Sequence, residues 1–199
     1  MGEVCRVHRG TATGANSTWI TDADDPALPS EVLFPAVTRA VELFGVAGGI
    51  LSSTYGLRAV INLPTDLDIF DKADRRRIDR FLRAAERRGV RAGYIARNRN
   101  PWWTVGLRAP APILATYMAR RPPAFVRNLA GAHNVNAAHG IYPREPMSAD
   151  VLDTLAAALR TAAPTAVGRT YAGGLLKFEP SEMARIIIPG PAILQEMTA

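Results

Sequence analysis

The strongest constraint on the fold is the contrast between one long helical pattern and many short apolar runs. Apolar residues recur at helical spacing over Lys72–Arg88, with Asp71 as the expected N-cap and Gly89 as the expected stop. A second helix is expected over Ser148–Arg160. The other apolar runs, of which Leu57–Leu63 is typical, are short and end at proline or glycine, as strands often do.

This pattern predicts a single compact α+β domain of short mixed strands with a few helices, covering residues 1–199. A chain of 199 residues is long enough to bury one good core. Because Pro189 and Pro191 interrupt the end of the chain, we expect an ordered body over about 1–190 and a tail over 191–199. Further elements are expected as strands at Ile113–Met118 and Phe125–Leu129, a glycine turn leading into a strand within Tyr171–Pro180, and a short helix at Ser181–Ile187.

The composition is that of an ordinary globular protein, with 48% hydrophobic and 21% charged residues. The sequence holds no uninterrupted stretch of about 18 apolar residues, which a membrane span needs. The first ten residues, MGEVCRVHRG, are charged and do not resemble a signal peptide. Cys5 is the single cysteine, which excludes an internal disulfide. We therefore expect a cytoplasmic protein without membrane contact.

The formal net charge of +6 comes almost entirely from arginine, since Lys72 and Lys177 are the only lysines. The planar guanidinium group suits phosphate groups and guanine edges better than an ammonium group does. The charge therefore favours nucleic-acid binding, while arginine-rich codon usage in a GC-rich genome is the alternative explanation. On the helix over Lys72–Arg88, the side chains expected to contact phosphates are Arg76, Arg80, Arg83 and Arg87. The alternative is that these arginines form only a solvated face.

The segment RNRNPWW (Arg97–Trp103) gathers two arginines, two asparagines and two indoles. Arginine forks to guanine or phosphate, and asparagine pairs with the edge of adenine. The first choices for DNA contact are therefore Arg97, Asn98, Arg99 and Asn100. Trp102 and Trp103 can stack on a base, or one of the two can be part of the core, and we expect one of them to be buried.

No catalytic motif emerges from the sequence. A dinucleotide-binding glycine pattern, a phosphate-binding loop and a serine-nucleophile elbow are all missing. Cys5 and His8 form the only close Cys/His pair, which is too few ligands for zinc, so no metal or cofactor is expected. The rival hypothesis is a small nuclease or hydrolase that uses His133 and His139, although a polar loop bonded to its own backbone is the simpler interpretation.

Several segments together resemble the target-recognition, or specificity, domain of TaqI-like adenine-specific DNA methyltransferases. The segments GTATGAN (Gly10–Asn16), RNRNPWWTV (Arg97–Val105) and PAPILATYM (Pro110–Met118) resemble the family's opening motif, its "R-x-PW" strand and the apolar strand that follows. FVRNLAGAHNVNAAHGIYP (Phe125–Pro143) resembles its Asn-rich segment, and GRTYAGGLLKFEPSEMARIIIP (Gly168–Pro189) resembles its closing motif, with Ala172 where the family often has a third glycine.

The resemblance implies a sequence-specific module that binds double-stranded DNA in a prokaryotic restriction-modification system. The family's catalytic motif and its S-adenosylmethionine-binding loop are not present in this sequence, so no methyl transfer is expected from this chain alone and a separate catalytic subunit is a candidate partner. A protein-interaction module derived from such a domain is the further alternative. Second choices for DNA contact are Thr13, Asn16, Asn134, Asn136 and Lys177.

Overall fold

The computed structural model describes residues 1–166 and 168–197, and the chain folds into two compact units. The first unit comprises Met1–Gly10, Val37–Thr54 and the chain from Pro110 onward. The second comprises Thr11–Ala36 and Tyr55–Ala109. Both units mix helices with short strands, so the expected α+β class is confirmed.

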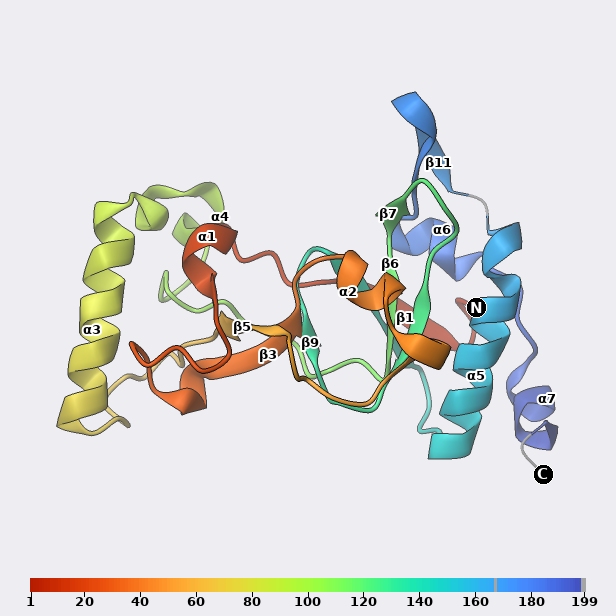
Figure 1. Ribbon diagram of the computed structural model, residues 1–199, viewed down its shortest axis with the longest axis horizontal. Helices are drawn as coiled ribbons and strands as arrows, with labels where there is room; N and C mark the ends of the chain where they lie inside the picture. The colour runs from red at the N-terminus through yellow and green to blue at the C-terminus, as the bar shows by residue number, and fades with distance from the viewer. Residues whose placement is uncertain (167, 198–199) are drawn as a thin grey trace. The chain divides into compact units, whose positions relative to one another are not determined.

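The first unit is built on a five-stranded sheet in the order β1-β10-β6-β8-β4 (Figure 1). Its strands are β1 (Cys5–Arg9), β4 (Ile50–Leu51), β6 (Ile113–Thr116), β8 (Phe125–Asn128) and β10 (Ala138–Pro143). The neighbours pair antiparallel except β4 and β8, which are parallel. The expected strands at Ile113–Met118 and Phe125–Leu129 are therefore present, the former shortened.

Helix α5 (Ala149–Ala162) packs against this sheet and closes the core of the first unit (Figure 1). Ser148 caps it as expected, because its hydroxyl accepts a hydrogen bond from the Val151 amide at 3.4 Å. The core side chains Phe125, Ile141 and Leu155 are almost fully buried. This packing gives the unit a rigid base.

The remaining elements of the first unit are short. They are α2 (Val41–Phe44), β7 (Met118–Ala119), β9 (His133–Asn134), β11 (Arg169–Tyr171), β12 (Leu175–Lys177), α6 (Pro180–Ala184) and α7 (Pro191–Glu196), with 3-10 turns at Ala47–Gly49, Ala163–Thr165 and Ala172–Gly174. The glycine turn and strand expected within Tyr171–Pro180 are thus confirmed. The prediction of a tail over 191–199 is wrong for its first part, since α7 is helical and Leu194 is fully buried against the core.

The second unit places strand β5 (Arg58–Ile61) between β2 (Ile20–Thr21) and β3 (Leu33–Val37), each antiparallel to it. Helix α3 (Lys72–Arg87) is its longest element, and its buried side chains include Ile78. Around them lie α1 (Asn16–Trp19), α4 (Tyr94–Arg97) and 3-10 turns at Ser30–Val32 and Val90–Ala92. Trp19 is fully buried and packs edge-on against Phe81 of α3, at 5.5 Å between ring centroids.

Candidate nucleic-acid interface

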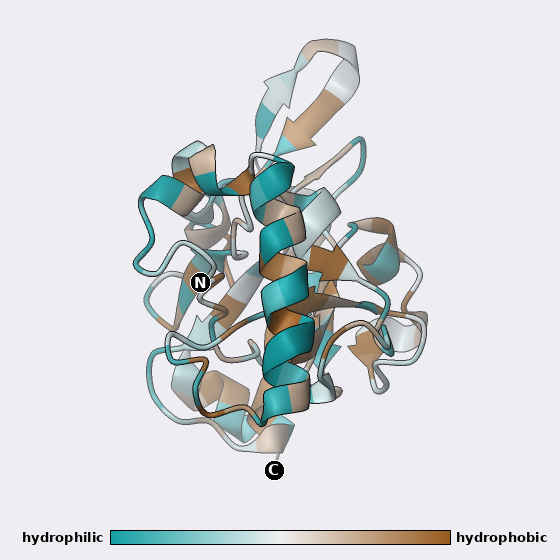
Figure 2. Ribbon diagram, turned by 90° about the vertical axis from the view of Figure 1, so that its left-hand side faces the viewer, coloured by the Kyte–Doolittle hydropathy of each residue, from teal (hydrophilic) through white to brown (hydrophobic). Residues whose placement is uncertain are grey.

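Helix α3 begins and ends where the sequence predicts. The Asp71 carboxylate accepts hydrogen bonds from the amides of Ala73 (2.7 Å) and Asp74 (2.9 Å), and these bonds lower the pKa of Asp71. Ile78 and Leu82 face the core at helical spacing. The helix therefore presents a fixed outer face, on which the ribbon is largely hydrophilic (Figure 2).

Two arginines of α3 are committed to bonds within the second unit. Arg75 pairs with Asp68 and with Asp79, the latter at 3.0 Å. Arg77 pairs with Asp74 at 2.8 Å and also donates to the backbone carbonyls of Pro26 and Leu28. These two side chains fix the helix to its surroundings.

The other arginines of α3 form a stripe on its exposed side. They are Arg76, Arg80, Arg83 and Arg87, all exposed, and none has an ion pair within the described chain. Their spacing of four, three and four residues keeps them on one side of the helix. We call this set the arginine stripe. It spans 12 residues, and the rise over its 11 residue steps is roughly 16 Å at 1.5 Å per residue.

The segment Arg97–Trp103 consists of the last residue of α4 followed by a turn. The prediction of a strand here, which rests on the family motif, is therefore wrong. The side chains of Trp102 and Trp103 anchor this turn to the rest of the second unit. Trp102 is 9% exposed and packs edge-on against Trp19, at 6.1 Å between centroids. Trp103 is half-buried and donates from Nε1 to the Pro64 carbonyl at 3.0 Å. The expectation that one of the two indoles is buried is confirmed.

Arg99 ties this turn to the glycine turn at residues 10–16. Its guanidinium donates to the backbone carbonyls of Ala12 at 2.6 Å and Thr13 at 3.1 Å. Burial lowers the pKa of this half-buried side chain. Arg99 thus holds two loops together, a role that the sequence pattern does not indicate, whereas its expected base contact stays a prediction.

Three neighbours of Arg99 remain accessible. Arg97, Asn98 and Asn100 are exposed. Asn98 donates one amide hydrogen to the Tyr94 carbonyl at 2.7 Å, at the end of α4. Its side-chain amide keeps a second hydrogen and an acceptor oxygen beyond this bond. These three side chains offer donors and acceptors in the combination that base edges require.

Thr13 is buried within the glycine turn and stabilises it, so its side chain does not face solvent. The Thr13 side chain is 2% exposed, donates to Asn16 Oδ1 at 2.5 Å and accepts from the Ala15 amide at 3.2 Å. Gly14 has φ of +84° and faces Ile95 so closely that a Cβ would lie 2.9 Å from it. The prediction of direct DNA contact by Thr13 is therefore corrected to a positioning role, while Asn16 is exposed.

Two predicted contacts in the first unit are also occupied within the protein. Asn134 is 8% exposed and donates to the Ala138 carbonyl at 2.9 Å, so its amide supports a turn and is not available to a base. Lys177 pairs with Glu179 at 2.6 Å, and this hydrogen bond raises the pKa of Lys177. Asn136, the third predicted contact in this unit, is exposed.

The rival enzymatic hypothesis requires an accessible His139. This side chain is 2% exposed, its Nε2 lies 3.1 Å from the Phe178 carbonyl oxygen, and its ring stacks on Tyr117 at 4.7 Å. Burial lowers its pKa and favours the neutral ring. His139 is a core residue in this structure, and the residues that the structure describes include no cluster of three metal-ligating side chains.

The comparisons place the chain among known proteins. A family model of the C-terminal domain of the type II methyltransferase M.Eco57I matches residues 1–199. The chain belongs to this family. The match confirms the resemblance found in the sequence motifs, and it makes the chain a methyltransferase-associated domain with a link to restriction-modification.

Two relatives extend this finding. The chain is 53% identical over 189 residues to the type II methyltransferase M.XamI of Xanthomonas campestris pv. amaranthicola, covering 95% of the chain and 36% of the relative. It is 22% identical over 204 residues to M.AccI of Acinetobacter calcoaceticus, covering 98% of the chain and 37% of that protein. The chain thus spans about a third of the length of these relatives.

A solved structure shows the same fold. The type IIG restriction endonuclease BpuSI matches with a TM-score of 0.59 at 12% identity, covering 98% of this chain and 25% of that chain. At this identity the likeness establishes the fold alone. Among the described helices, none has both the length and the hydropathy that would let it cross a membrane.

Proposed function

We propose that this chain binds double-stranded DNA in a sequence-specific manner, as the recognition part of an adenine-specific DNA methyltransferase. The arginine stripe of α3 is the observation that carries the proposal. Its four exposed guanidinium groups lie along one side of a rigid helix, and none has an acidic partner among the described residues. Such an array matches a run of phosphates, because DNA carries one charge per roughly 3.4 Å along each strand.

Base reading is assigned to the turn at Arg97–Asn100. Its exposed side chains are Arg97, Asn98 and Asn100, and Arg99 and the two indoles hold the backbone in place. A rigid turn loses little conformational freedom on binding, so its side chains discriminate between bases more sharply than a mobile loop would. Exposed Asn16 and Asn136 are the secondary candidates for DNA contact.

Methyl transfer belongs to a catalytic part, on a separate subunit or elsewhere in a longer protein. That part supplies the S-adenosylmethionine site and the pocket for the extruded adenine. The role of the present chain is to hold the duplex in register, and no chemical step falls on its own side chains.

The test is the salt dependence of binding to a fluorescein-labelled duplex, followed by fluorescence anisotropy. Each phosphate contact contributes about −0.9 to the slope of log K against log salt concentration. Replacing the four stripe arginines with glutamine should therefore make the slope shallower by up to about 3.6. The matched control is Arg91→Gln, since Arg91 already pairs with Glu86 at 2.8 Å. A wild-type chain that binds without a salt slope, or not at all, would contradict the proposal.

A further inference from the structure

The first unit carries a projecting hairpin with an exposed tip. Strands β11 and β12 pair antiparallel over three residues each, and the turn between them holds Gly173 and Gly174 at φ of +73° and +72°. Every residue of 169–174 is exposed, and Tyr171 is 48% exposed. Figures 1 and 2 both show this hairpin extending away from the rest of its unit.

The base of the hairpin is firmly anchored. Phe178 follows β12, is 1% exposed, and donates its amide to the Tyr117 carbonyl at 2.7 Å. Leu176 packs against the core of the first unit, and β12 also pairs with β7. The base of the hairpin is therefore fixed to the first unit, and Tyr171 lies in its exposed outer part.

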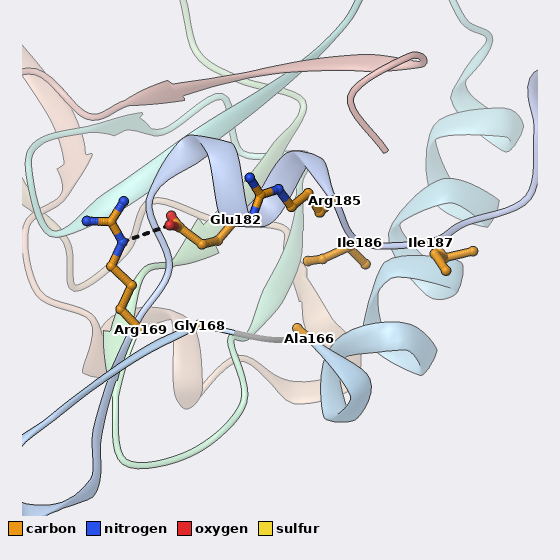
Figure 3. Close-up of a pocket in the computed structure, with 7 residues that line it drawn as sticks. All are labelled: Ala166, Gly168, Arg169, Glu182, Arg185, Ile186 and Ile187. Atoms are coloured by element: carbon orange, nitrogen blue, oxygen red, sulfur yellow. Dashed lines mark hydrogen bonds and ion pairs between the residues drawn. The ribbon is translucent and has the colours of Figure 1, made fainter.

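Several charged side chains at the base of the hairpin are paired with one another. Arg169 pairs with Glu182 of α6 at 2.8 Å, and both line a surface pocket of about 520 Å³ (Figure 3). Glu179 accepts from Lys177 at 2.6 Å and from Arg9 at 2.7 Å, and these bonds lower the pKa of Glu179. Arg185 lines the same pocket, is exposed and has no ion pair among the described residues, so the base keeps one uncompensated guanidinium group beside these paired charges.

The tip region keeps its positive charge. Arg120 donates from Nε to the Gly173 carbonyl at 3.0 Å, a bond to a neutral group that leaves the charge of the guanidinium uncompensated. The guanidinium of Arg121 lies 3.6 Å from the centre of the Phe44 ring. Neither arginine has an acidic partner among the described residues. Only Arg120 is bonded to the tip, so the tip combines an exposed tyrosine with one uncompensated guanidinium group, while the Arg121 guanidinium lies over Phe44 of α2.

We propose that the tip of this hairpin is a second DNA-contacting element, which enters a groove of the duplex. Tyr171 lies against the bases there, while Arg120, which bonds to the Gly173 carbonyl at the tip, pairs with a neighbouring phosphate. A two-stranded ribbon fits the width of the major groove, and tyrosine presents an aromatic face and a hydroxyl to it. The inference rests on the proposed function, and it adds a contact made by the first unit.

A second copy of the chain is the competing occupant, since β11 is an edge strand. The edge is short and begins with charged Arg169, which are features that oppose strand addition. The positive charge at the tip also favours a polyanion over an identical positively charged surface.

In the experiment, wild-type chain and hairpin variants are titrated into a labelled pool of random-sequence duplexes. Each duplex has about 30 base pairs, which is long enough to hold several binding sites of half a helical turn or more. Tyr171→Ala should weaken binding about tenfold, the size expected for loss of one contact with base edges in the groove, and Tyr171→Phe should retain most of the affinity because the ring remains. Ala172→Asp should weaken binding by repelling phosphates, whereas its uncharged match Ala172→Asn should not.

The outcomes separate the two proposals. Wild-type binding that Tyr171→Ala and Ala172→Asp leave unchanged would overturn the hairpin inference and leave the proposed function standing. A wild-type chain that binds no duplex would overturn both. Dimerisation in gel filtration that Tyr171→Ala abolishes, without a change in DNA affinity, would assign the tip to a second copy and overturn the inference. Circular-dichroism melting should be the same for all variants, because these side chains are exposed.

Discussion

Arg97 and Arg99 are two residues apart, yet the structure predicts opposite consequences for their replacement. Arg99→Ala removes two hydrogen bonds from a charged donor to the carbonyls of Ala12 and Thr13. Each such bond contributes about 1.5–3 kcal/mol when well shielded, and water replaces part of that at a half-buried site. We expect the free energy of unfolding to fall by about 1–2 kcal/mol in Arg99→Ala. Arg97→Ala should leave it unchanged, since Arg97 is exposed and forms no side-chain hydrogen bond in the described part of the chain.

Urea unfolding followed by tryptophan fluorescence is suited to this comparison. All three tryptophans, Trp19, Trp102 and Trp103, lie in the second unit, so the signal reports on the unit that Arg99 holds together. Arg99→Lys should fall between wild type and Arg99→Ala, because an ammonium group reaches one carbonyl but lacks the fork. If Arg97→Ala and Arg99→Ala unfold at the same urea concentration, the assignment of Arg99 as the link between the two loops is wrong.

Three further predictions concern the first unit. The contribution of His139 to the free energy of unfolding should be constant above its unfolded-state pKa near 6.5 and fall as the pH drops below it, because burial lowers the folded-state pKa and protonation then favours the unfolded chain; His139→Gln should flatten this part of a pH series of denaturant titrations. Cys5 is 1% exposed and burial raises the pKa of its thiol to about 11, so iodoacetamide at about pH 8 should label it only after unfolding, and rapid labelling of the native chain, followed by mass spectrometry, would contradict this. Asp153→Ala should destabilise the chain by about 1–2 kcal/mol in thermal unfolding, since it leaves the buried Arg127 guanidinium without its 2.7 Å ion pair, and an unchanged melting temperature would count against that role.

Local signals explain what the sequence predicts correctly. The Asp71 cap, the spacing of Ile78 and Leu82 and the stop at Gly89 are each encoded within a few residues, so the bounds of α3 follow from sequence. The same holds for Ser148 at the start of α5. The exposure of the arginine stripe also follows, because it lies opposite the apolar side of the helix.

The roles of single polar residues in the turns depend on distant partners. Arg99 acts on carbonyls 86 and 87 residues away, and no local pattern encodes such a pairing. Thr13 and Asn134 have the residue types of DNA contacts, but their side chains satisfy buried backbone and side-chain groups instead. Helix α7 is not predicted from the sequence, because proline usually ends a helix. Pro191 instead occupies the first turn of α7, where proline is tolerated.

The hairpin tip shows a related limit. The glycine turn before β12 is visible in the sequence, yet no local pattern singles out Tyr171 or Arg120. Arg120 lies 53 residues before Gly173, to which it bonds, so their proximity emerges only with the pairing of β7 and β12.

The central claim, sequence-specific recognition of duplex DNA, is tested most directly by selection from a randomised duplex library with washes at rising salt. We predict that the wild-type chain enriches one motif, and that Arg97→Ala and Asn100→Ala each relax it at particular positions while Arg91→Gln leaves it intact. Each lost base contact should relax discrimination at its position by about 1–3 kcal/mol. Enrichment of no motif at any salt concentration would contradict the account, because the exposed turn would then carry no information about sequence.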